Sequence, residues 1–146
     1  MLPELAEFIG FNRVSVAFSP EVVEEIDEIV SRYPERLAAL IPVLYVAQRE
    51  FGVVSREVLN LVADQLDVPA AKVLNTATFY TMFYKERVGR HHVQVCKNLS
   101  CFLRGCDELM AVMRDEVGLT PGDVAEDGSF SLEGVECLAA CGTAPI

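Results

Sequence analysis

Five cysteines are the residues of this chain with the clearest capacity for chemistry, and all of them lie after the first ninety-five residues. Four residues separate Cys96 from Cys101 in the first close pair. Three residues separate Cys137 from Cys141 in the second pair, and thirty-five residues lie between the pairs. In a chain without an export signal, thiols grouped in this way bind metal more often than they form disulfides. The chemistry is therefore expected in the C-terminal part.

The spacing of the two pairs discriminates between kinds of metal site. A [2Fe-2S] cluster needs four thiolates, two on each iron, so two separate pairs on adjacent loops match its chemistry. Structural zinc usually binds pairs separated by two residues, and neither pair has that spacing. Buried apolar thiols or redox-active thiols are the metal-free alternative. The pattern favours one [2Fe-2S] cluster on the four paired cysteines, with zinc and metal-free thiols left as alternatives.

The remaining candidate ligands fit this site less well. Cys106 lies five residues beyond Cys101 in a predicted helix, and we expect it to be a buried structural thiol without a metal. His91 and His92 are adjacent, so a strand directs them to opposite faces. A cluster with two histidine ligands is disfavoured because four cysteines already suffice, and both histidines are expected at the surface.

Two predicted strands and a helix position the cysteines. Alternating residues before Cys96 predict one strand, and SFSLEGVEC (129–137) predicts a second. Between them, apolar spacing predicts one continuous helix over 102–118, with Leu103 among its buried residues. Strand, helix and strand form a βαβ unit, in which the two cysteine pairs follow the ends of neighbouring parallel strands.

The first part of the chain contains four amphipathic segments joined by short turns. Ser19 and Ser55 are predicted N-caps, and Gly52 is a predicted helix end. Pro42 either bends the second helix or marks a late start. The fourth helix is predicted to run over 70–84, which places its aromatic residues at helical spacing, as core or docking side chains rather than as a cofactor site. A small antiparallel helical bundle is the predicted fold of this part.

Charge and hydropathy exclude several functions. Twenty-two acidic and twelve basic residues give a formal net charge of -10, which disfavours nucleic acid as a partner. No secretory signal is visible at the start of the chain. The longest apolar run, 37–47, is interrupted by Pro42 and is shorter than the ~20 residues that span a bilayer. We expect no direct membrane insertion, although membership of a membrane-bound assembly stays open.

Several segments together carry a family resemblance. They are IPVLYVAQREFG, TATFYTMFY, GRHHVQVC and ECLAACGTAP, in that order. With these segments the chain resembles the small [2Fe-2S] subunit of the NADH dehydrogenase module of respiratory complex I, also called the E subunit of NADH:quinone oxidoreductase. In this resemblance Cys96, Cys101, Cys137 and Cys141 fall on the positions of the cluster ligands.

The resemblance implies an α+β protein, with an N-terminal antiparallel helical bundle and a C-terminal thioredoxin-like [2Fe-2S] ferredoxin domain. It implies FMN and NAD on a partner, the flavoprotein subunit that oxidises NADH, and a larger iron-sulfur subunit in the same complex. This chain has no glycine-rich dinucleotide fingerprint, so no activity is expected from it alone. The implied location is the cytoplasm, or the cytoplasmic face of the membrane within a peripheral arm.

The expected organisation is a flexible lead-in over 1–18, a helical bundle over 19–86 and a thioredoxin-like domain over 87–146. Chains of the family usually continue beyond the AP dipeptide, so the last domain is expected to be incomplete at its C-terminus. The same module occurs in NAD-linked hydrogenases and formate dehydrogenases, which is the alternative assignment. A stand-alone ferredoxin and a zinc-binding interaction module are weaker alternatives, because the helical part has no evident use in a free ferredoxin.

Overall fold

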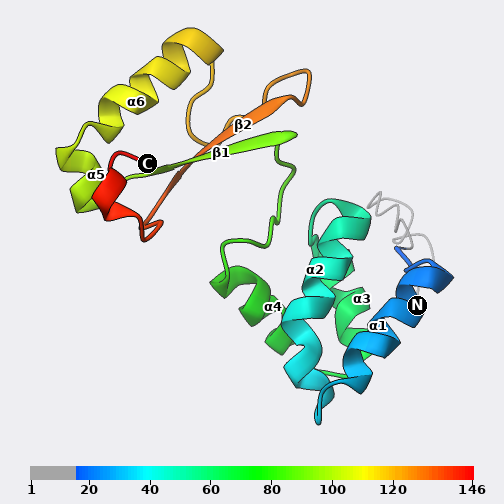
Figure 1. Cartoon of the computed structure of the whole chain (residues 1–146). Helices are drawn as coiled ribbons and strands as arrows, with labels where there is room; N and C mark the ends of the chain where they lie inside the picture. The colour runs from blue at the N-terminus through cyan, green and yellow to red at the C-terminus, as the bar shows by residue number, and fades with distance from the viewer. Residues whose placement is uncertain (1–15) are drawn as a thin grey trace, which may run out of the picture. The chain divides into compact units, whose positions relative to one another are not determined.

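A computed structural model describes residues 16–146 of the chain, so most of the predicted lead-in lies outside the described residues. The chain divides into two compact units, of which one ends at Lys85 and the other begins at Glu86 (Figure 1). The first unit is helical, and the second combines two strands with short helices. In the described part of the chain, no helix is both long and apolar enough to cross a membrane.

Capping residues that can be recognised in the sequence mark several of the helix ends in the first unit. They are α1 (Pro20–Ser31), the 3-10 turn η2 (Arg36–Ala39), α2 (Leu40–Phe51), α3 (Arg56–Leu66) and α4 (Ala70–Phe79). The Ser19 hydroxyl accepts a hydrogen bond from the Val22 N–H, and the Ser55 hydroxyl accepts one from the Val58 N–H, both at 3.4 Å. Gly52 ends α2 in the left-handed conformation, at φ 78°. The three predicted cap positions are confirmed.

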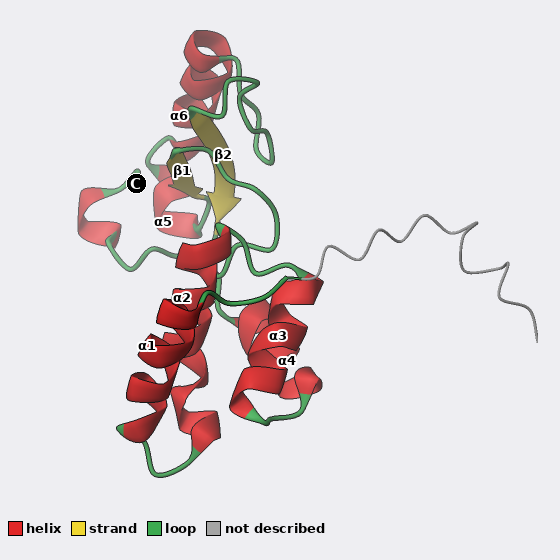
Figure 2. Cartoon of the chain, turned by 90° about the vertical axis from the view of Figure 1, so that its right-hand side faces the viewer, coloured by secondary structure: helices red, strands yellow, loops and turns green. Residues whose placement is uncertain are grey.

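Pro42 marks a late helix start rather than a bend. The 3-10 turn η2 comes first, and α2 begins at Leu40, so Pro42 lies in its first turn. A proline is tolerated there because the first N–H groups of a helix have no partner within it. The apolar stripes of α1 to α4 then meet in one core that includes the fully buried Ile26, Leu44 and Leu66. Figure 2 shows these four helices packed together.

The fourth helix is shorter than its apolar spacing predicts. It ends at Phe79, and Tyr80 has an extended backbone, with φ -91° and ψ 118°. Phe79 is left 77% exposed, whereas Phe83 is fully buried. The Phe83 ring packs on Tyr45 of α2, with 5.2 Å between the ring centroids. The prediction of a helix through residue 84 is wrong.

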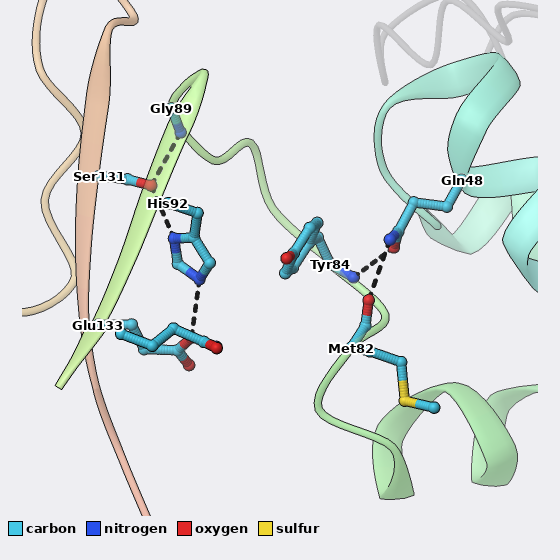
Figure 3. Close-up of polar contacts among 8 residues, drawn as sticks. Gln48, Met82, Tyr84, Gly89, His92, Ser131 and Glu133 are labelled. Atoms are coloured by element: carbon cyan, nitrogen blue, oxygen red, sulfur yellow. Dashed lines mark hydrogen bonds and ion pairs between the residues drawn. The ribbon is translucent and has the colours of Figure 1, made fainter. Parts of the chain in front are cut away.

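A glutamine on α2 holds the segment that replaces the missing turns. The Gln48 side-chain N–H donates to the Met82 carbonyl at 3.0 Å, and the Gln48 carbonyl oxygen accepts from the Tyr84 N–H at 2.6 Å (Figure 3). The Tyr84 carbonyl in turn accepts from the Val54 N–H at 2.8 Å. These tertiary hydrogen bonds satisfy the Tyr84 N–H, which a longer helix would also have paired, and the Met82 and Tyr84 carbonyls, which the last turn of that helix would have left unpaired. They therefore outweigh the local helical preference.

The second unit is built on two parallel strands. Its elements are β1 (His91–Cys96), α5 (Leu99–Leu103), α6 (Cys106–Val112), the π-helical turn η3 (Met113–Val117), β2 (Phe130–Val135) and the 3-10 turn η4 (Cys141–Thr143). His91 lies opposite Phe130, and Cys96 lies opposite Val135. Its core includes Val95, Leu132 and the buried cysteines. The predicted parallel strand pair is confirmed.

The predicted continuous helix between the strands is wrong. Gly105 adopts φ 96°, a left-handed conformation that interrupts the helix between α5 and α6. Leu103, which was expected in the core, is 72% exposed. A glycine inside a helical pattern was the local signal for this break.

The far edge of β2 is covered by the loop that precedes it. The Gly122 N–H donates to the Leu132 carbonyl at 2.7 Å, and the Leu132 N–H donates to the Asp123 carbonyl at 3.1 Å. Val124 forms an isolated antiparallel bridge with Ser131. This loop satisfies backbone groups that an open strand edge would expose.

Candidate metal centre

Both cysteine pairs begin at the carboxyl end of the parallel strand pair. Cys96 is the last residue of β1, and Cys137 lies two residues beyond Val135, where β2 ends. Because the strands are parallel and Cys96 lies opposite Val135, their carboxyl ends lie together. The fold therefore brings the loops that carry the two pairs to one end of the second unit.

The first pair is buried and in mutual contact. Asn98 caps α5, its side-chain oxygen accepting the Leu99 N–H at 2.9 Å, and Cys101 lies in this short helix. The thiols of Cys96 and Cys101 are hydrogen-bonded to each other. The Asn98 backbone N–H donates to the Cys96 sulfur and lowers its pKa. Burial raises the pKa of Cys101, so the proton of the pair is favoured on Cys101 and the thiolate on Cys96.

The second pair lies on an exposed loop. Cys137 and Cys141 are both exposed, and neither forms a disulfide. The Ala139 N–H donates to the Cys137 sulfur at 3.3 Å. Ala139 itself has φ 58°, a conformation that folds the loop back at this point. Cys141 opens the 3-10 turn η4.

This loop closes over the end of β1. The Cys96 N–H donates to the Ile146 carbonyl at 2.8 Å. The Leu138 backbone N–H also donates to the Cys96 sulfur, which adds to the lowering of its pKa. Negative charge on the Cys141 sulfur also raises the pKa of Cys101, although it is the smallest of the influences on that thiol. The two cysteines are therefore close enough to interact electrostatically.

The four sulfurs are not gathered into a finished metal site. Across residues 16–146, no group of three or more His, Cys, Asp or Glu side chains has the arrangement of a metal site. Cys96 and Cys101 are brought together, whereas Cys137 and Cys141 lie on the neighbouring loop with their thiols exposed. The two loops lie at one end of the strand pair, and the assignment of all four cysteines to one centre stays a prediction.

The donor set nevertheless fits a [2Fe-2S] cluster. All four cysteines are free thiols, and they sit in two pairs on adjacent loops, which suits two irons with two thiolates each. Backbone N–H groups already point at the sulfurs of Cys96 and Cys137. Amide donors of this kind stabilise the negative charge of thiolate ligands.

Cys106 has a different environment. It is fully buried, and its thiol faces the Asp107 carboxylate, with 3.9 Å between the sulfur and Oδ1. Burial, and then the Asp107 charge, raise the pKa of this thiol. Burial raises the pKa of Cys101 in the same way, so the pKa does not separate these two thiols. Cys106 stays outside the predicted ligand set because it belongs to neither close pair.

One of the two histidines is not the surface residue that the sequence suggested. His91 is exposed and its ring packs near Phe130, whereas only 12% of the His92 side chain is exposed. His92 faces Ser131 and Glu133 on β2. Strand alternation places His92 on the same face as Gln94, and this polar pair is the one sequence signal that could have indicated a cross-strand network, which was not predicted.

Comparison with known proteins agrees with these features. Residues 26–146 match the family described as thioredoxin-like [2Fe-2S] ferredoxin. An E subunit of the NADH-quinone oxidoreductase of Rhizobium meliloti (strain 1021), numbered 2, is 43% identical over 123 residues, which cover 84% of this chain and 73% of the relative. The E subunit of the NADH-quinone oxidoreductase of Rickettsia conorii is 38% identical, with 82% and 74% covered.

A third relative, the E subunit of the NADH-quinone oxidoreductase of Rickettsia bellii, is 37% identical over 123 residues, with 82% of this chain and 74% of the relative covered. The family match extends over both units of the structure, since it begins within α1 and reaches Ile146. The resemblance seen in the sequence is confirmed. The chain belongs to the thioredoxin-like [2Fe-2S] ferredoxin family.

Proposed function

We propose that this chain is an electron-transfer subunit of an NADH-quinone oxidoreductase and that it holds one [2Fe-2S] cluster. The observation that carries the proposal is the pair of free dithiol loops at one end of a parallel strand pair. The relatives named as E subunits of NADH-quinone oxidoreductases share most of their length with this chain, which supports the choice of complex.

Each loop supplies one half of the ligand set. Cys96 and Cys101 would hold one iron, and Cys137 and Cys141 would hold the other. When bound, the cluster supplies one-electron transfer. The protein supplies the four thiolates and the amide N–H groups beside them, which hold negative charge on sulfur.

The two-electron chemistry of NADH is assigned to a partner. The chain has no glycine-rich fingerprint for a dinucleotide, so NAD and FMN are proposed to bind a flavoprotein subunit, with a larger iron-sulfur subunit in the same assembly. The helical part, 19–86, is proposed to serve docking within that assembly. A cytoplasmic, peripheral position in the complex completes the proposal.

Metal and sulfide analysis of the purified chain, together with its visible spectrum, tests the cluster. We expect two irons and two sulfides for each chain. Colourless protein with one zinc would overturn the proposal. Identification of the proteins that copurify tests the complex: quinone-reducing membrane subunits agree with it, whereas a hydrogenase or formate-oxidising subunit would reassign the chain to the alternative enzyme.

A further inference from the structure

A chain of polar contacts ties the two strands together before they reach the cysteines. The Gly89 N–H donates to the Ser131 hydroxyl oxygen at 2.8 Å. The same oxygen lies 2.8 Å from Nδ1 of His92, and Nε2 of His92 lies 3.0 Å from Oε2 of Glu133 (Figure 3). Gln94 also donates to Oε2 of Glu133, at 3.0 Å. The contacts run back and forth between β1 and β2.

The donors and acceptors fix the direction of the contacts made by Gly89 and Glu133, and they allow the Ser131 O–H to donate to His92. A backbone N–H can only donate, so the Ser131 oxygen accepts from Gly89 and its own O–H is free to donate to Nδ1 of His92. The Glu133 carboxylate can only accept, so Nε2 of His92 carries the proton. Neutral His92 in this tautomer satisfies both neighbours at once.

The serine at the centre of these contacts is buried. Ser131 is 3% exposed, and within residues 16–146 it is the one buried polar side chain. Gly89 approaches the same place so closely that a Cβ built on it would lie 2.3 Å from the Phe130 carbonyl carbon. A buried hydroxyl that loses its partners is strongly unfavourable, so any other pairing of β1 with β2 is penalised here.

We propose that His92 is a positioning residue: with Ser131 and Glu133 it fixes the register of β1 on β2, and so the relative placement of the two cysteine pairs. Cys96 follows His92 by four residues, and Cys137 follows Glu133 by four. A slip of one residue moves each strand side chain by about 3.3 Å and to the opposite face. This inference rests on the proposed cluster site.

The test uses the full chain and substitutions that separate this role from general stability. His92→Leu removes both contacts of the ring, and Ser131→Ala removes the central hydroxyl. His91→Leu is the matched control, because it makes the same change at the neighbouring position, outside the contacts of Ser131 and Glu133. His92→Asn places a carbonyl oxygen where Nδ1 accepts, and is the conservative rescue variant.

Three measurements are made on each variant: the circular dichroism and electron paramagnetic resonance spectra of the cluster, its rate of release to a chelator, and the thermal midpoint. We expect His92→Leu and Ser131→Ala to alter the spectra and to speed release roughly five- to tenfold. His91→Leu should match the wild type, and His92→Asn, which keeps the contact with Ser131 but not the one with Glu133, should restore the spectra in part. Unaltered spectra and release in both variants, even with a lower midpoint, would overturn the proposal, as would an equal effect of His91→Leu.

Amide exchange without the cluster separates failure of this inference from failure of the cluster proposal. The Lys97 N–H donates to the Val135 carbonyl at 2.8 Å, at the cysteine end of the strand pair. We expect this amide in the metal-free chain to exchange roughly five to ten times faster in His92→Leu than in His91→Leu. If the wild type holds no cluster, the site assignment fails and this exchange result alone decides the role of His92. Equal Lys97 exchange in the two variants would then overturn it.

Discussion

Replacement of the Gln48 side-chain amide by a carboxylate tests whether Gln48 determines where α4 ends. Gln48→Glu keeps the shape of the side chain and keeps an oxygen for the Tyr84 N–H, but it replaces the N–H donor to the Met82 carbonyl by a second oxygen. At pH 7 a carboxylate oxygen would then face a carbonyl oxygen at the former hydrogen-bond distance of 3.0 Å. We expect the segment after α4 to detach more readily.

The expected size follows from the contacts. Loss of one hydrogen bond lowers the free energy of unfolding by about 1 kcal/mol, and the half-buried carbonyl left without its donor adds about 1–2 kcal/mol. The retained bond from Tyr84 limits the total, so we expect the free energy of unfolding to fall by about 2–3 kcal/mol.

Gln65→Glu is the matched control, because the backbone carbonyl of Gln65, rather than its side chain, accepts from Arg36. This variant should change stability by less than about 0.5 kcal/mol.

The loss should depend on pH in a defined direction. A protonated carboxyl group regains a donor for the Met82 carbonyl, so the fold favours the protonated form and raises the pKa of the introduced group above the ~4.3 of an unfolded chain. The folded state then binds more protons than the unfolded state, so the deficit relative to wild type shrinks as pH falls through the raised pKa. The deficit in stability is complete at pH values well above the raised pKa, and it is absent at pH values below the pKa of the unfolded chain.

Hydrogen exchange with mass spectrometry measures the effect locally, without assuming that both units unfold together. Peptides from residues 40–84 should exchange roughly 30- to 150-fold faster in Gln48→Glu at pH 7, the range that corresponds to 2–3 kcal/mol. The ratio to wild type should be smaller at pH 5, compared at equal intrinsic exchange rates. Wild-type exchange rates at pH 7, or the same ratio at both pH values, would refute the reasoning.

Three further substitutions or assays test the second unit and the division of labour. Cys96→Ser or Cys137→Ser should abolish cluster assembly because an alkoxide poorly replaces a thiolate on iron, whereas Cys106→Ser should retain the visible absorption; the reverse pattern would show that the ligand assignment is wrong. Gly89→Ala should destabilise the second unit by about 3 kcal/mol in thermal unfolding, since its Cβ would overlap the β2 backbone, while Gly142→Ala, with open space around it, serves as the control. The purified chain should not be reduced by NADH until a flavoprotein partner is added, so bleaching by NADH alone would contradict the assignment of flavin to that partner.

Local chemistry made part of this fold predictable from the sequence. The caps at Ser19 and Ser55 and the helix end at Gly52 each depend on one residue and its near neighbours, and each stands as predicted. The end of α4 depends instead on Gln48, which is 34 and 36 residues away from its two partners. Periodicity carries no information about such a distant contact, so it extended the helix beyond Phe79.

The same division applies to the cysteines. Strand alternation is a local signal, and a helical connection between two neighbouring strands favours parallel pairing, so the sequence placed Cys96 and Cys137 at one end of the second unit although the strands are far apart in the chain. The difference in burial between the pairs depends on how the loops close, which spacing does not determine. Cys96 and Cys101 lie buried in mutual contact, whereas Cys137 and Cys141 are exposed on their loop. The second loop is held by backbone hydrogen bonds, such as that from the Cys96 N–H to the Ile146 carbonyl, which join residues far apart in the sequence, so spacing alone could not show which pair the fold encloses.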